Sequence, residues 1–142
     1  MLISLNYQLM YSFIFKVSEE NSIKIADVGL AKPAEIITGT VAGTYVYMAP
    51  EVYDSKKYNE KVDIYSLGII LWEMWYGKRG YRLPGSVEEF FRWLKEGNRP
   101  VNEPGKEPPW NHLMKQCWSG NPENRPTTKE CKREIERVCS LK

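Results

Sequence analysis

The segment 62–76 is apolar on nearly every side, and this constrains the fold more than any other feature of the sequence. A helix at a protein surface shows one polar face, whereas a helix without a polar face is buried. Asn59 is a favourable N-cap for this segment, and Gly77 is placed to end it. We therefore expect a buried helix over residues 62–76.

A capping box predicts a second helix, because a Ser at the N-cap with Glu three residues later satisfies backbone donors at a helix start. Residues 86–89 have this pattern, and the helix that follows carries Phe90, Phe91 and Trp93 and stops at Gly97. These aromatic residues fit either the core or a partner-binding patch.

Further helices are predicted toward the C-terminus. Residues 110–118 form a short one, whereas residues 99–109 contain four prolines and are expected to be irregular. A second capping box at residues 127–130 begins an amphipathic helix. Its expected inward-facing residues are Cys131, Ile135, Val138 and Cys139.

The first third of the chain has a different character. Residues 22–26 alternate and contain β-branched side chains, which predicts a short strand, and residues 17–21 before it read as a turn. Residues 27–47 show no helical period and form a long loop, and loops of that length are usually functional or disordered. The order is a hairpin, a loop and then helices, so the predicted fold is mainly α.

Charge and cysteine content limit the partners. The formal net charge is only +2 and both signs are interspersed, so we expect neither nucleic acid nor a membrane surface as a partner. Three cysteines without metal-ligand spacing indicate reduced thiols and a cytoplasmic location. The apolar residues 1–15 lack the basic start of a signal peptide and are shorter than the roughly 20 residues that span a bilayer.

An ordered set of short motifs adds a more specific signal. It consists of Asp27-Val28-Gly29, Gly43-Thr44, Met48-Ala49-Pro50-Glu51, Asp63 to Gly68, Cys117-Trp118, Asn121-Pro122 and Arg125-Pro126. This order closely resembles the C-terminal lobe of a eukaryotic protein kinase. The resemblance implies transfer of the ATP γ-phosphate to hydroxyls of protein Ser, Thr or Tyr. The stretch 43–51 is similar to the Ser/Thr or tyrosine-kinase-like pattern, so we favour Ser and Thr over Tyr.

The resemblance implies a fold and its boundaries. It implies a mainly α, kinase C-terminal-lobe fragment with a short β-hairpin before an activation segment. Residues 17–142 would be a partial kinase domain, with the activation segment at 27–51 and a helical lobe after it. Residues 1–16 would lie outside the family. A truncated transcript or a mispredicted exon boundary would produce such a segment.

Roles for residues in the long loop follow from the resemblance. Asp27 would bridge the ATP phosphates to Mg²⁺, and Gly29 would let the backbone turn; the alternative for Asp27 is a turn-forming carboxylate. Thr38 and Thr40 resemble activation-loop phosphorylation sites, with ordinary exposed hydroxyls as the alternative. Thr44 would face the peptide substrate.

Three further residues would have structural roles. The resemblance places Glu51 beside Arg125, which lies 74 positions away, as a buried ion pair that anchors the end of the activation segment. Asp63 would accept backbone hydrogen bonds from the catalytic loop. The alternative for Asp63 is a carboxylate favoured by the dipole at a helix start.

Several parts of a kinase have no counterpart in these 142 residues. There is no Gly-rich phosphate loop, no strand lysine, and no His-Arg-Asp with a following Asn in residues 1–15, and Val28 replaces Phe. We therefore expect no catalytic residue and no phosphate transfer by this chain alone, and we doubt that it binds ATP and Mg²⁺. The alternative function is a pseudokinase-like docking or regulatory module, acting through residues 87–93 and the loop after Gly97.

The partners expected are a protein substrate or a docking protein, and a chaperone. In the family, the buried helix packs against elements upstream of the strand at 22–26. We therefore expect an exposed apolar patch beside residues 62–72, which would favour aggregation or chaperone binding.

Overall fold

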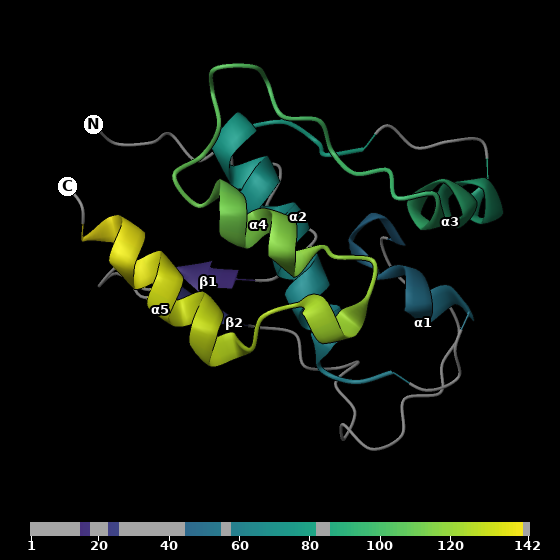
Figure 1. Ribbon diagram of the computed structural model, residues 1–142, viewed down its shortest axis with the longest axis horizontal. Helices are drawn as coiled ribbons and strands as arrows, with labels where there is room; N and C mark the ends of the chain where they lie inside the picture. Colours follow the sequence, from purple (N-terminus) through teal and green to yellow (C-terminus); the bar gives the residue numbers. More distant parts are fainter. Residues whose placement is uncertain (1–14, 18–22, 26–44, 55–57, 82–85, 141–142) are drawn as a thin grey trace.

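The computed structural model describes residues 15–17, 23–25, 45–54, 58–81 and 86–140. Figure 1 shows α2, Lys61–Tyr76, running through the middle of the helical part with α4, Asn111–Cys117, beside it. The other elements in chain order are β1 Phe15–Val17, β2 Ile23–Ile25, η2 Tyr45–Tyr47, α1 Pro50–Asp54, α3 Val87–Lys95, η3 Pro122–Asn124 and α5 Thr128–Cys139. The mainly α fold with a short hairpin is confirmed.

The two strands form the predicted hairpin pair. They are antiparallel, with Phe15 opposite Ile25 and Val17 opposite Ile23. The turn predicted between them falls mostly on residues 18–22, which lie outside the described residues.

Helix α2 is the buried helix that the sequence predicts. Tyr65 and Ile69 are fully buried in it, and Gly77 ends it in the left-handed conformation at φ 63°. Its start is one residue earlier than predicted, and Glu60 rather than Asn59 is the N-cap, although the Asn59 side chain accepts a hydrogen bond from the Lys61 amide at 3.1 Å. The apolar pattern thus fixes the helix to within a residue.

The exposed apolar side chains of α2 lie at its C-terminal end and not beside residues 62–72. The apolar side chains of residues 62–72 are buried or half-buried, so the expected exposed patch beside them is wrong. Instead, Met74 and Trp75 at the end of α2 are 49% and 40% exposed. Helix α4 lies along α2, whereas Trp110 meets Trp75 in the last turn of α2 edge-on, with ring centroids 5.5 Å apart, and leaves both Met74 and Trp75 partly exposed.

An aromatic cluster joins α1 to α3. The Tyr53 and Phe91 rings stack with centroids 4.6 Å apart, and Tyr45 meets Phe90 edge-on at 5.3 Å. Phe90 and Phe91 are buried and therefore belong to the core, whereas Trp93 on the same helix is 40% exposed. This cluster holds the end of the long loop against the helices.

Helix α5 begins with the complete capping box predicted for it. The Thr127 amide donates to Glu130 Oε2 at 2.7 Å, and the Glu130 amide donates to Thr127 Oγ1 at 3.3 Å. Cys131 and Val138 are buried as expected, but Cys139 is exposed, so its predicted inward position is wrong. Cys139 is the last residue of the helix, beyond the face that packs on the core.

The capping box gives a prediction for acid stability. Hydrogen bonds from the Thr127 amide and hydroxyl lower the pKa of Glu130 from its ordinary value of 4.5. A carboxylate with a lowered pKa stabilises the fold fully above that ordinary value, and the contribution is lost as the pH falls through the lowered one. We expect Glu130→Gln to lower the thermal midpoint at about pH 7 and to match the wild type at about pH 2.

Thermal scans followed by circular dichroism at both pH values would measure this difference. Glu88→Gln, an exposed first-turn substitution in α3, is the matched control. An equal deficit of Glu130→Gln at both pH values would contradict the role assigned to the ionised carboxylate.

Candidate functional site

The end of the long loop is fixed onto helix α2. Val46 and Tyr47 of η2 and Ala49 after it are buried. The Ser66 hydroxyl of α2 donates to the Tyr47 carbonyl at 2.8 Å. Residues 45–54, which follow the long loop, are therefore held in a defined position against α2.

A buried ion pair anchors this segment to the C-terminal part of the chain. Arg125 Nη1 lies 2.6 Å from Glu51 Oε1, and Arg125 Nη2 lies 2.9 Å from Glu51 Oε2. The Arg125 side chain has no exposed surface, and that of Glu51 is 19% exposed. This two-point geometry between guanidinium and carboxylate is strong and orientation-specific. The contact predicted between these two residues is observed.

The remaining donors of Arg125 bind backbone carbonyls. Its Nε donates to the Ser119 carbonyl at 2.9 Å, and its Nη1 also donates to the Lys61 carbonyl at 3.0 Å. In return, the Lys61 ammonium donates to the Arg125 carbonyl. Arg125 thus joins α1, the first turn of α2 and the loop after α4.

Two guanidinium groups lie close to the ring of Tyr65, an arrangement that the sequence analysis missed. Arg125 Cζ is 5.1 Å and Arg99 Cζ is 5.3 Å from the centroid of its ring, which is fully buried. Burial raises the pKa of the Tyr65 hydroxyl, and the hydroxyl lies 3.5 Å from that of Tyr81. A neutral aromatic face thus stabilises two buried or half-buried cations.

Glu73 is a second residue that the sequence analysis missed. It is buried near the end of α2 and accepts hydrogen bonds from the Tyr47 hydroxyl at 2.8 Å and the Gly80 amide at 2.9 Å. Arg79 Nη1 in turn donates to the Tyr47 hydroxyl at 3.3 Å. A Glu within an otherwise apolar helix is the signal that could have found it, because a buried carboxylate needs partners.

Asp63 has no hydrogen-bond partner for its side chain within the part of the chain that the structure describes. It is exposed, yet desolvation by neighbouring protein and, second, the Glu60 carboxylate raise its pKa above the ordinary value. The expected contact with a catalytic loop therefore stays a prediction.

The amino-acid sequence matches the model of one protein family over most of its length. The model described as protein tyrosine and serine/threonine kinase matches residues 15–135. The chain belongs to the protein kinase family. The match covers the hairpin, the anchored segment and nearly all of the helices.

Individual kinases are similar over most of this chain. It is 38% identical over 127 residues to a probable serine/threonine-protein kinase of Dictyostelium discoideum, covering 80% of this chain and 7% of that protein. A dual serine/threonine and tyrosine protein kinase of Takifugu rubripes is 32% identical over 114 residues, covering 78% and 12%. A serine/threonine/tyrosine-protein kinase of Arabidopsis thaliana is 36% identical over 113 residues, covering 78% and 29%. The chain thus spans a small part of the kinases it matches.

The cofactors of the kinase family were tested against the described residues. Kinases use ATP with Mg²⁺, which prefers oxygen ligands such as carboxylates. Among the residues described, no group of three or more His, Cys, Asp or Glu side chains could hold a metal ion. The described residues therefore supply no metal site, and Asp27, which the resemblance assigns to Mg²⁺, lies outside them.

The predicted site residues divide into described and undescribed ones. Asp27, Gly29, Thr38, Thr40 and Thr44 all lie outside the described residues. Of the predicted site residues, the structure brings Glu51 and Arg125 together, and Asp63 lies in the first turn of α2.

No helix within the described ranges is long and apolar enough to cross a membrane.

Proposed function

We propose that this chain forms the peptide-facing, helical part of a protein kinase domain. The parent protein would transfer the γ-phosphate of ATP to Ser or Thr hydroxyls of protein substrates. The Glu51–Arg125 pair carries this proposal, because it fixes the end of the segment 27–51 to the helical lobe in the way that the family requires. The Ser/Thr preference rests on the pattern at 43–51.

The residues of the loop take their roles within this proposal. Asp27 would hold Mg²⁺ against the ATP phosphates, with Gly29 allowing the sharp turn after it. Thr44 would face the substrate peptide, and phosphorylation of Thr38 or Thr40 would order the segment by adding negative charge. Three cysteines without disulfide partners among the described residues support a cytoplasmic location.

This chain by itself would be inactive. Phosphoryl transfer depends on several groups that position the substrates and stabilise charge together. The catalytic Asp and Asn, the Gly-rich loop and the strand lysine have no counterpart in the 142 residues. Asp27 alone cannot replace them.

We predict that the purified 142-residue chain transfers no phosphate from radiolabelled ATP to itself or to a generic protein substrate. The assay should include a vector-only preparation and the Asp27→Asn variant as controls. All three should give the same background, because the groups that position ATP are absent. Incorporation above the vector-only background that Asp27→Asn abolishes would contradict the proposed inactivity.

A non-catalytic docking module is the second candidate. The observation in its favour is Trp93, which is 40% exposed on α3 although its neighbours Phe90 and Phe91 are buried. A pull-down from cell extract in which Trp93→Ala changes no captured protein would remove this candidate.

A further inference from the structure

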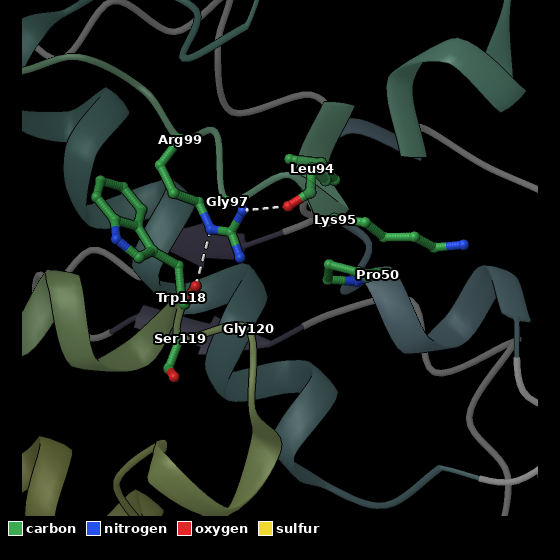
Figure 2. A pocket seen from close by; sticks show the side chains of 8 residues that line it. All are labelled: Pro50, Leu94, Lys95, Gly97, Arg99, Trp118, Ser119 and Gly120. Atoms are coloured by element: carbon green, nitrogen blue, oxygen red, sulfur yellow. Dashed lines mark hydrogen bonds between the residues drawn. The ribbon is translucent and has the colours of Figure 1, made fainter. Parts of the chain in front are cut away.

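A surface hollow of about 470 Å³ lies where α1, α3 and the loop after α4 meet, and Figure 2 shows it from close by. This volume falls within the range of about 300–1,000 Å³ that is typical of ligand sites. The walls are mostly apolar, and one guanidinium group points into the hollow between them (Figure 2). The lining residues are Pro50, Leu94, Lys95, Gly97, Arg99, Trp118, Ser119 and Gly120.

The guanidinium group of Arg99 is rigidly held. Its Nε donates to the Trp118 carbonyl at 2.8 Å, and its Nη1 donates to the carbonyls of Leu94 and Asn98 at 2.9 and 2.6 Å. The ring of Tyr65 supports it from the core side. A donor held in this way loses little conformational entropy when it binds a ligand.

Arg99 has an unused donor and an unpaired charge. No carboxylate oxygen in the part of the chain described here lies within 4.0 Å of it, and its Nη2 makes no hydrogen bond there. Nη2 faces Gly120, where an added Cβ would come within 3.8 Å of it. Because Gly120 has no side chain, this edge of the guanidinium remains open to the hollow.

The charge in the hollow is that of a single cation. The other basic residue of the lining, Lys95, pairs with Asp54 at 2.6 Å and lies 5.8 Å above the Tyr53 ring, so its charge is already compensated. A phosphate group carries a charge of about −1.5 to −2, which one guanidinium does not balance, whereas a carboxylate carries a single negative charge.

We propose that this hollow binds the carboxylate of an acidic side chain in a partner peptide, with Arg99 Nη2 as the donor. An apolar residue next to the acidic one would lie against the apolar part of the wall. The choice of a peptide over a free organic acid rests on the proposed function, because Pro50 lies in the segment 27–51, in which Thr44 is proposed to face the substrate peptide. Binding at the hollow needs neither ATP nor phosphate transfer.

The test is a fluorescence-anisotropy titration of the full chain, kept in solution by fusion to maltose-binding protein. The probes are the labelled peptide Gly-Phe-Glu-Phe-Gly, amidated at its C-terminus, and the same peptide with Gln in place of Glu. The Glu peptide should bind at least about tenfold more tightly, since the Gln amide lacks the charge that Arg99 matches. The fusion partner alone should bind neither.

Two variants test the site itself. Arg99→Gln removes the donor, and Gly120→Leu fills the space before Nη2 while leaving the three carbonyl contacts of Arg99 in place. Each should weaken binding of the Glu peptide at least about tenfold. Arg133→Gln removes an equal charge from exposed helix α5 and should change nothing.

Equal affinities for the Glu and Gln peptides would overturn the proposal. Unchanged binding by Gly120→Leu would also overturn it, even if Arg99→Gln fails to fold. Because no nucleotide is present, this outcome is independent of whether the parent protein proves to be a kinase that acts on Ser or Thr.

Discussion

Replacement of Arg125 by Met is expected to lower the free energy of unfolding by about 3–5 kcal/mol, because it leaves the partly buried Glu51 carboxylate without its partner. The substitution also removes the donors for the Ser119 and Lys61 carbonyls. Typical total stabilities are about 5–15 kcal/mol, so much of the population would unfold in a marginal protein. Met keeps the length and apolar character of the Arg stem, which limits the loss from packing.

Pulse proteolysis in urea would measure this loss, because it reads the folded fraction at low protein concentration and avoids aggregation. Arg133→Met, on the exposed face of α5, is the matched control and should change stability by no more than about 0.5 kcal/mol. A loss below about 1 kcal/mol for Arg125→Met would show that the pair does not hold the segment.

Gly68→Ala is the second change with a large expected effect. A Cβ at this position would lie 2.9 Å from Cys117 Cβ and 3.2 Å from the Met114 carbonyl oxygen and the Trp118 amide nitrogen. Two of these neighbours are backbone atoms of α4 and of the residue that caps it, so helices α2 and α4 would have to move apart. Overpacking of this kind costs about 1–3 kcal/mol.

Whether Gly68→Ala lowers or raises the free energy of unfolding shows whether α2 and α4 approach closely at this residue. In a helix interior without contacts, Gly→Ala would stabilise by about 1 kcal/mol. We expect a net loss of stability in urea titrations followed by tryptophan fluorescence. Gly120→Ala is the control, since its nearest neighbour would be 3.8 Å away and its backbone is not left-handed. A stabilised Gly68→Ala variant would show that α2 and α4 do not approach closely at this point.

Local patterns predicted the helices well. The start and end of α2 followed from an apolar run and from Gly77, and the start of α5 followed from Thr127 and Glu130. These signals act between residues a few positions apart, which is why the sequence shows them directly. Cys139 was misplaced because periodicity alone does not say where a helix leaves the core.

The contacts of the site were less predictable because they join distant parts of the chain. Glu51 and Arg125 were paired only through the family resemblance, since nothing local connects them. The approach of Arg99 and Arg125 to the Tyr65 ring depends on how α2, the loop after α3 and the loop after α4 pack together. No spacing in the sequence encodes that arrangement.

The coupling energy between Glu51 and Arg125 tests most directly whether the chain has the architecture of a kinase C-terminal lobe. A double-mutant cycle with Glu51→Gln, Arg125→Met and both together would isolate it from the losses that each substitution causes separately. If the pair anchors the segment to the helical lobe, the coupling should be at least about 1.5 kcal/mol, as measured for close charge pairs elsewhere. A coupling within about 0.5 kcal/mol of zero, the limit expected for independent sites, would contradict the account.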